Sequence, residues 1–346
     1  MKSLIYYQTE AQVKLNESIN HASSIVVLCD TNTSQHCLPC LLSFIPKLKG
    51  ALVISVPEGE KSKDWKFAMR IWKKLLKNNA DRNTLFINLG GGVVCDLGAF
   101  VASVFKRGIP YIHIPTSLMA QVDAAIGGKT AININGIKNQ IGTFQLPKAV
   151  CVFTEFLSTL AQQHVYAGFA EMLKHALIAD KNYWDELKNV QHSGQIISSF
   201  DMIKQSIEIK SKIVSKDFYE NNERKKLNFG HTIGHVLESI CTQNNNLLLH
   251  GEAVAWGMLA EAYISREKAI LSQQALDEIE TIIRFYFKPL SFRQNIEQTI
   301  RFLYADKKRV GDKQNITLIK KIGTAVINQD CSEKQVISAI QYINEC

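Results

Sequence analysis

Two histidines stand four residues apart in the segment Asn228-Phe-Gly-His231-Thr-Ile-Gly-His235, a spacing that puts both imidazoles on one face of a helix. His250 opens the next helical stretch, and Glu171 stands on an earlier one. Imidazoles and a carboxylate from separate helices can bind zinc and leave one coordination position open for a substrate. These residue types therefore predict a catalytic metal centre.

The spacing also limits the class of metal enzyme. Thr232 follows His231, so the chain lacks the glutamate that serves as general base in the HExxH pattern of zinc peptidases. His175 lies one helical turn after Glu171 and is an alternative ligand, because spacing alone does not exclude it.

A glycine-rich turn over residues 89–96 (LGGGVVCD) follows an apolar run and opens a helical one. Glycines let the backbone approach a pyrophosphate closely, and the N-terminus of a helix favours the negative charge. The third glycine of the dinucleotide pattern GxGxxG is missing, because Cys95 stands in its place. The strand–turn–helix context still favours a nucleotide site, to which Asp30 and Glu60, with Lys63 nearby, would add groups for ribose hydroxyls.

A third group of residues consists mainly of cations and amides, and in its densest part they stand beside glycines, where the backbone can fold tightly around an anion. Its densest part is the segment 123–130 (DAAIGGKT), followed by residues 136–139 (GIKN). The members are Arg107, Asp123, Lys129, Lys138, Asn139, Lys210, Arg224, Asn228 and the triplet Asp306-Lys307-Lys308.

The elements that must position these groups change character along the chain. Apolar runs at 24–29, 51–56, 84–89 and 111–114 predict parallel strands covered on both faces. Between them, residues 64–77 predict a helix whose apolar stripe is Trp65, Ala68, Ile71, Trp72 and Leu75. After Phe153 the strand signals thin out, and helices are predicted at 167–178, 198–214, 229–240, 252–269 and 274–286.

This alternation followed by helices predicts a doubly wound α/β nucleotide domain and then a mainly helical domain, with a cleft between them. We place the boundary in a polar segment, which gives an NAD-binding domain at 1–156 and a metal- and substrate-binding domain at 157–346.

Composition excludes several classes of protein. With 46% hydrophobic and 21% charged residues the chain is globular, and no apolar run reaches the ~18 residues of a membrane span. The first residues turn polar too soon for a signal peptide, and the eight cysteines are scattered, so we expect a cytoplasmic protein with reduced thiols. The pair Cys37 and Cys40 has no second CxxC to complete a zinc site. The net charge of +8 is spread along the chain, which gives no support for nucleic-acid binding.

Taken together, the motifs resemble the 3-dehydroquinate synthase family of sugar-phosphate cyclases. The matching segments run in the family's order from about residue 26 to residue 310. They are GGGVVCD (90–96), KRG (106–108), PTSLMAQVDAAIGGKT (115–130), KNQIGTF (138–144), GFAEMLK (168–174), NFGHTIGH (228–235), HGEAVAWGM (250–258) and DKK (306–308).

The resemblance implies an N-terminal Rossmann-like α/β domain, an all-α C-terminal domain and a homodimer. It implies catalytic NAD⁺ and a zinc or cobalt ion held by Glu171, His231 and His250, with His235 assisting proton transfer. The residues implied to contact NAD⁺ are Asp30, Glu60, Lys63, Gly91, Gly92, Val93, Asp96, Thr116, Ser117, Lys129, Lys138, Thr159 and Leu160.

The implied reaction converts 3-deoxy-D-arabino-heptulosonate 7-phosphate into 3-dehydroquinate and phosphate, in the shikimate pathway of aromatic amino acid biosynthesis. The resemblance assigns the substrate's phosphate to Lys129, Asn139, Asn228 and Arg107, the last of these across a dimer interface. It assigns the carboxylate to Lys210 and Arg224, and the ring hydroxyls to Asp123, Lys174 and Lys307.

The chain departs from the family pattern at few positions. Cys95 replaces a usual glycine, Gly98-Ala99 reverses the expected order, and residues 162–164 (QQH) are less basic than usual. The first two departures predict looser packing around the dinucleotide, whereas none of the three touches a residue expected to bind metal.

Overall fold

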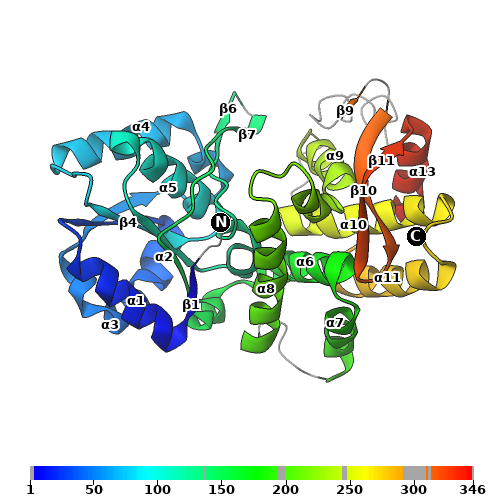
Figure 1. Cartoon of the computed structure of the whole chain (residues 1–346), viewed down its shortest axis with the longest axis horizontal. Coiled ribbons are helices and arrows are strands. Elements are labelled where there is room, and N and C mark those ends of the chain that lie inside the picture. Colours follow the sequence, from blue (N-terminus) through cyan, green and yellow to red (C-terminus); the bar gives the residue numbers. More distant parts are fainter. Residues whose placement is uncertain are drawn as a thin grey trace. The chain divides into compact units, whose positions relative to one another are not determined.

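The computed structural model describes residues 4–135, 137–193, 199–243, 248–290, 309–310 and 313–344. The chain divides into two compact units, Met1–Ala161 and Gln162–Cys346 (Figure 1).

The first unit is built on a six-stranded parallel sheet with the strand order β1-β8-β5-β4-β2-β3. The strands are β1 (Ile5–Tyr7), β2 (Ile25–Asp30), β3 (Leu52–Val56), β4 (Leu85–Gly90), β5 (Tyr111–Pro115) and β8 (Ala149–Val152). All six residues of β4 are buried, as expected for a central strand that carries helices on both faces. The four strands predicted from apolar runs are confirmed as β2, β3, β4 and β5.

Helices cover both faces of this sheet and form two separate hydrophobic clusters. One face packs against α4 (Trp65–Lys77) and α5 (Gly92–Val104). The other packs against α1 (Gln8–Asn20) and α3 (Leu38–Phe44), and the short helix α2 (Thr31–His36) precedes α3. A two-stranded hairpin, β6 (Ile132–Ile134) with β7 (Ile137–Ile141), stands apart from the main sheet.

The structure confirms most of the apolar stripe that was predicted for helix α4. Ala68, Ile71 and Leu75 are buried, and the Asp64 side chain caps the helix by accepting a hydrogen bond from the backbone N–H of Lys66. The prediction is wrong for Trp65, whose side chain is 42% exposed. It lies at the first turn and contacts the indole of Trp72 edge-on, with ring centroids 5.3 Å apart, instead of entering the core.

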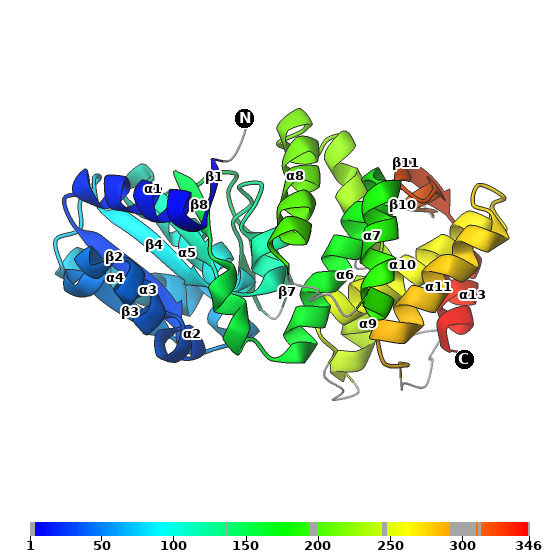
Figure 2. The same ribbon diagram turned by 90° about the horizontal axis from the view of Figure 1, so that it is seen from below.

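The second unit is helical around a buried central helix, α10 (His250–Glu267). α10 contacts α6 (Gln162–Ala179), α9 (His231–Gln243), α11 (Gln273–Tyr286) and α13 (Glu333–Asn344), as Figures 1 and 2 show. Two further helices, α7 (Lys181–Ser193) and α8 (Phe200–Lys216), pack on α6. Because α10 touches both α6 and α9, residues of these three helices can share one site.

One element of this unit was not anticipated from the sequence. The strands β9 (Arg309–Val310), β10 (Lys313–Lys321) and β11 (Thr324–Cys331) form an antiparallel sheet within the otherwise helical unit. Four consecutive residues of β10, 316–319, are buried, so the strand lacks the alternating pattern that identifies a sheet with one face exposed to solvent. Over the described part of the chain, no helix has both the length and the apolar character that a membrane span requires.

Candidate active site

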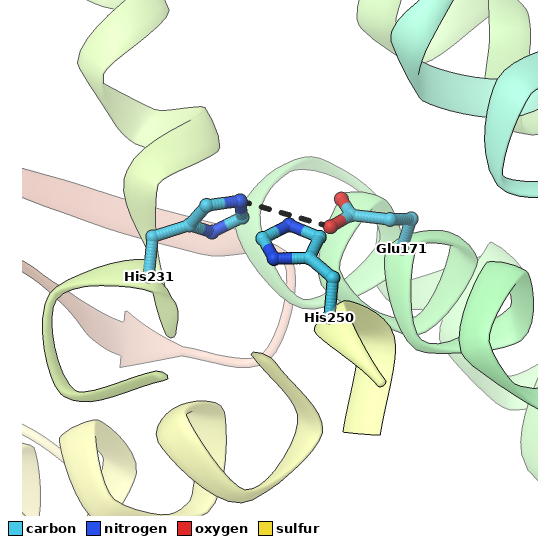
Figure 3. A group of neighbouring side chains, drawn as sticks. All are labelled: Glu171, His231 and His250. Carbon is cyan, nitrogen blue, oxygen red and sulfur yellow. Dashed lines mark ion pairs between the residues drawn. The ribbon is translucent and has the colours of Figure 1, made fainter. Parts of the chain in front are cut away.

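Three predicted metal ligands lie together in the second unit. Glu171 of α6, His231 at the first residue of α9 and His250 at the first residue of α10 offer ligand atoms that all lie within 4.8 Å of one another. Their side chains converge from three different helices (Figure 3). His231 Nε2 lies 3.7 Å from Glu171 Oε1, a separation that an ion between the two groups can bridge.

Each imidazole is oriented through its other ring nitrogen. His231 Nδ1 lies 3.3 Å from the carbonyl oxygen of Phe229, and His250 Nδ1 lies 3.3 Å from Glu238 Oε2. A carbonyl or a carboxylate accepts hydrogen bonds, so each Nδ1 carries the proton and Nε2 has the lone pair that binds a metal. Outer carboxylates and carbonyls hold metal-binding histidines in this way in many zinc sites.

The donor set fits a divalent ion. The Glu171 side chain is completely buried, where a carboxylate requires a cation as its partner. The ammonium of Lys174, also buried, forms an ion pair with this carboxylate. One carboxylate with two imidazoles is the composition of a zinc site that keeps a position open for substrate.

A second set overlaps the first and shares one of its members. His235, Glu238 and His250 also bring their ligand atoms within 4.8 Å of one another. Since Glu238 faces the Nδ1–H of His250, its carboxylate is better suited to orient that imidazole than to bind the same ion. His235 is exposed, with its ring centroid 5.6 Å from that of His231, which suits a group that carries protons next to the metal.

Close helix packing brings the ligands to this distance. A Cβ at Gly251 would lie 2.0 Å from the backbone oxygen of Ala167, one turn before Glu171, so only glycine lets α10 approach α6 here. The buried carboxylate of Glu261 on α10 fixes the start of α9. It accepts hydrogen bonds from the backbone N–H groups of Gly230 at 2.6 Å and Ile233 at 3.2 Å. Helix α10 thus fixes the surroundings of both histidines. Gly251, next to His250, packs on α6, and Glu261 binds the backbone N–H of Gly230, next to His231.

The predicted anion-binding residues of this unit are mostly buried. Lys174 and Lys210 are 1% and 5% exposed, and Arg224 is 3% exposed. Arg224 Nη1 donates to the carbonyl of Phe218 at 2.6 Å, and Asn228 Nδ2 donates to Glu220 Oε1 at 2.8 Å. Arginine and lysine are seldom buried unless an acidic group or a ligand pairs with them, as Glu171 pairs with Lys174.

Two further residues that were candidates for the site belong to this unit, His175 and Lys307. His175, the alternative to the chosen ligands, is buried with Nδ1 2.7 Å from the hydroxyl of Ser206 on α8, a contact that orients its ring. Lys307, with its neighbours Asp306 and Lys308, lies outside the described residues.

In the first unit, the predicted dinucleotide residues gather at one edge of the sheet. β2 pairs with β3 on one side and with β4 on the other, so the direction in which the chain crosses the sheet reverses between β2 and β4. Sheets of this kind bind their ligands at the carboxyl ends of the strands, next to that reversal. Asp30 ends β2, the turn Gly90–Gly92 ends β4 and starts α5, and Thr116 and Ser117 follow β5. The N–H groups of the first turn of α5 face this edge without intrahelical partners.

Glu60 and Lys63 follow β3 at the same edge and join a polar network. The ammonium of Lys63 donates to Asp96 Oδ2 at 2.5 Å and to Asn139 Oδ1 at 2.6 Å. Burial lowers the pKa of Lys63, but Asp96 and Glu60 raise it by more, so the amine keeps its proton. Burial raises the pKa of the Asp96 carboxyl, against the opposing effect of Lys63.

The remaining candidates of the first unit lie on its surface or at its loops. Lys129, Lys138, Asn139 and Arg107 are exposed, and Asn139 and Arg107 have positive φ values of 55° and 68°. Asp123 is half-buried in the turn 120–124, and Thr159 and Leu160 end the short helix after β8.

The comparisons with known proteins agree with this geometry. Models of the 3-dehydroquinate synthase N-terminal and C-terminal domains match residues 53–167 and 168–309. The 3-dehydroquinate synthase of Parabacteroides distasonis is 38% identical over 323 residues, which cover 93% of this chain and 91% of that protein. The chain belongs to the 3-dehydroquinate synthase family.

Two solved structures of other enzymes have a fold similar to that of this chain. The 2-epi-5-epi-valiolone synthase of Streptomyces hygroscopicus, solved with NAD⁺ and Zn²⁺, has a TM-score of 0.89 at 22% identity and covers 100% of this chain and 97% of its own. A 2-deoxy-scyllo-inosose synthase, solved with carbaglucose-6-phosphate, NAD⁺ and Co²⁺, has a TM-score of 0.84 at 20% identity, with coverage of 98% and 96%. At these identities the likeness establishes a shared fold.

The departures from the family pattern pack closely around the glycine turn. A Cβ at position 98 would lie 1.8 Å from Oδ1 of Asn88, so Gly98 lets α5 rest directly on β4. Cys95 is buried, with Sγ 3.7 Å from the carbonyl oxygen of Gly90. Both residues therefore pack closely against the protein, and looser packing around the dinucleotide stays a prediction.

Sequence reasoning missed several residues that orient the site. Glu238 and Glu261 hold the histidine helices, Asn133 joins the network of Lys63, and Asp217 binds the backbone of the Arg224 loop. Only Glu238 had a sequence signal, because it follows His235 by three residues on the same helix. Cys37 is buried, which raises its pKa to about 11, and the seven described cysteines are free thiols, so the CxxC pair is not an activated redox site.

Proposed function

We propose that this chain is a 3-dehydroquinate synthase, a carbon–oxygen lyase of the shikimate pathway that converts 3-deoxy-D-arabino-heptulosonate 7-phosphate into 3-dehydroquinate and phosphate. The observation that carries the proposal is the convergence of Glu171, His231 and His250 in a chain that matches both domains of that family. The cofactors in the proposal are NAD⁺ and Zn²⁺ or Co²⁺, which the structures of similar fold contain.

When bound, NAD⁺ accepts and returns a hydride, and the metal acts as a Lewis acid toward the alcohol being oxidised. Glu171, His231 and His250 hold the ion. The dinucleotide is assigned to the carboxyl edge of the sheet, where Asp30 and the turn at Gly91 and Gly92 lie.

Residues of the second unit bind the organic part of the substrate and move protons. Arg224 and Lys210 hold its carboxylate with charge-assisted hydrogen bonds, which are strong because both cations are withdrawn from water. Lys174 orients a ring hydroxyl next to Glu171, and the exposed His235 carries the proton that the hydroxyl loses. Lys307 is assigned to the ring hydroxyls as well.

The first unit contributes the residues that bind the phosphate before it leaves. Lys129, Asn139 and Arg107, with Asn228 of the second unit, are assigned to its oxygens, and Asp123 to a ring hydroxyl. These groups stabilise the phosphate as it leaves. The phosphate can itself accept the proton that the elimination releases, so no separate carboxylate base is needed. We further propose that the enzyme is a cytoplasmic homodimer in which Arg107 reaches the partner's substrate.

The experiment that tests the function separates a cyclase from an ordinary dehydrogenase. The zinc-loaded protein is given the heptulosonate phosphate and a sub-stoichiometric amount of NAD⁺, and phosphate and NADH absorbance are followed. We expect phosphate release to exceed the NAD⁺ many times over without net growth of NADH. One NADH for each substrate consumed would overturn the cyclase in favour of a dehydrogenase.

A matched pair of variants locates the leaving group. Lys129→Ala should slow phosphate release roughly a hundredfold or more, because a cation that stabilises developing charge is lost. Lys148→Ala removes another exposed lysine of the same unit and should leave the rate unchanged.

A further inference from the structure

Asn133, in the hairpin β6–β7, makes three hydrogen bonds that connect two segments with different assigned ligands. Its Nδ2 donates to Glu60 Oε1 at 2.7 Å, and its backbone N–H donates to the carbonyl of Lys63 at 2.7 Å. Its Oδ1 accepts from the backbone N–H of Asn139 at 2.9 Å. Glu60 and Lys63 are assigned to the dinucleotide, and Asn139 to the substrate's phosphate.

We infer that Asn133 is a positioning residue that couples dinucleotide binding to phosphate binding. The inference rests on the proposed function for the identity of the two ligands. It assigns to Asn133 no contact with either of them.

The hairpin depends on these contacts for its conformation. Among the residues described, two pairs join its strands, Ile132 with Ile141 and Ile134 with Ile137, and a two-stranded hairpin by itself is marginally stable in water. Asn139 has φ 55°, a left-handed conformation that a residue other than glycine holds when its surroundings fix it. The hydrogen bond from its N–H to Asn133 is one such fixing contact.

Lys63 completes the link by setting which end of the Asn139 amide faces the anion. The Lys63 ammonium can only donate, so the atom that it contacts at 2.6 Å must be Oδ1 of Asn139. The Nδ2 group of Asn139 then points away from Lys63, and it is this donor that an anion requires. The same ammonium is bound to Asp96, so a dinucleotide that orders Lys63, Glu60 or Asp96 also orders Asn139.

This arrangement predicts positive coupling between the two ligands. Whichever ligand binds first fixes the shared segment, and the second ligand then loses less conformational entropy on binding. The effect is reciprocal, and couplings of this kind are typically about 5- to 150-fold in affinity.

The test measures the coupling itself. The dissociation constant of NAD⁺ for the zinc-loaded protein is determined by calorimetry without phosphate and with saturating inorganic phosphate. We expect phosphate to tighten NAD⁺ binding by about fivefold or more in the unmodified protein. Asn133→Ala removes both side-chain bonds and should reduce this factor to less than about twofold.

Two more variants keep the result interpretable. Asn133→Asp retains an oxygen for the Asn139 N–H but replaces the donor to Glu60 with a second carboxylate, so it should also lose the coupling. Gln140→Ala is the matched control, because its side chain lies on the same hairpin and bonds only the carbonyl of Lys138 among the contacts described. It should retain the coupling of the unmodified protein.

The outcomes separate this inference from the proposed function. If NAD⁺ binds and phosphate is released from the heptulosonate phosphate, but the coupling is absent or survives in a folded Asn133 variant, the role of Asn133 is wrong and the enzyme assignment stands. If the unmodified protein neither binds NAD⁺ nor releases phosphate, both are wrong.

Discussion

The imidazole of His250 and the carboxylate of Glu238 face each other, with Nδ1 and Oε2 3.3 Å apart. Glu238 belongs to α9, the helix that begins at His231, whereas His250 begins α10. One helix therefore supplies one of the proposed metal ligands and contacts another. The position of this carboxylate should matter for metal affinity although it is not assigned as a ligand.

Replacing Glu238 should weaken zinc binding. Loss of an outer partner of a metal-binding histidine typically costs about 10–100-fold in affinity, so we expect that loss for Glu238→Ala and a smaller one for Glu238→Gln, whose amide oxygen can still accept from Nδ1–H. Competition with a chelating dye measures the dissociation constant, and the visible spectrum of the Co²⁺ form reports the ligand geometry.

A structural carboxylate elsewhere in the same unit provides the control. Glu278 accepts hydrogen bonds from Trp184 Nε1 at 2.6 Å and Lys188 Nζ at 2.9 Å. Glu278→Gln should lower the free energy of unfolding without changing zinc affinity. Equal zinc affinity in Glu238→Ala and the unmodified protein would show that Glu238 does not orient the ligand.

The close approach of α10 to α6 leads to a second prediction. In Gly251→Ala the new methyl group would lie 2.0 Å from the carbonyl oxygen of Ala167, so the helices must separate. Overpacking of this kind costs about 1–3 kcal/mol of stability, and the displacement should also separate His250 from Glu171 and weaken zinc binding. Denaturant unfolding and zinc competition measure the two effects. Gly50→Ala, where a Cβ meets nothing within 4 Å, is the control, and unchanged zinc binding in Gly251→Ala would contradict the prediction.

Local sequence patterns identified residues that converge at the candidate metal site, but not the residues that support them. His231 and His235 show helical spacing directly, and the parallel strands carry continuous apolar runs, so both could be identified from local patterns. Glu261 is thirty residues from His231 in the chain and looks like any helical glutamate. Its role arises from the packing of α10 against α9, which no local pattern records.

The strands β10 and β11 show the same limit for the fold. Ile316, Leu318 and Ile319 are all buried, because the sheet packs within the helical unit, and a short apolar run with that burial reads equally well as helix. Asn133 carries no signal of its own, since a polar residue that alternates with Ile132 and Ile134 in a strand ordinarily faces solvent. Its role is visible only from tertiary contacts such as the hydrogen bond to Glu60, which lies 73 residues away in the chain.

The loop that holds Arg224 should respond to acid through Asp217. The Asp217 carboxylate accepts backbone hydrogen bonds from Asn222 at 2.6 Å, and from Asn221 and Arg224 at 3.0 Å. Partial burial raises the pKa of Asp217, but these hydrogen bonds lower it by more, so its pKa lies below the ordinary value.

The sign of the effect follows from that shift. A carboxyl group with a lower pKa in the folded state stabilises the fold above its unfolded pKa of about 3.9, and the contribution is lost as pH falls through the folded pKa. The free energy of unfolding of the metal-free protein should therefore fall more steeply below about pH 4 than that of Asp217→Asn. Denaturant titrations from neutral to acidic pH measure the difference, and parallel curves would contradict the assigned role of Asp217.

Arg224 offers the sharpest test of the carboxylate assignment. Arg224 is 3% exposed and donates from Nη1 to the carbonyl of Phe218, a contact that orients its planar guanidinium. Arg224→Lys keeps the charge but loses the planar, two-pronged geometry. Losing a charge-assisted hydrogen bond costs about 1.5–3 kcal/mol, or roughly ten- to a hundredfold in kcat/KM for the heptulosonate phosphate.

The control for this substitution is Lys226→Arg, in the same short helix 223–228, where the lysine pairs with Glu223 at 2.8 Å on the surface. Surface ion pairs of this kind contribute about 0–1 kcal/mol, so kcat/KM should not change. Steady-state phosphate release measures both variants, and the free energy of unfolding shows whether Arg224→Lys also loosens the loop. If kcat/KM of Arg224→Lys stayed within twofold of the unmodified enzyme, the assignment of the substrate's carboxylate to Arg224 would be wrong. A buried guanidinium that binds the carboxylate cannot be replaced by an ammonium with so small a loss in kcat/KM.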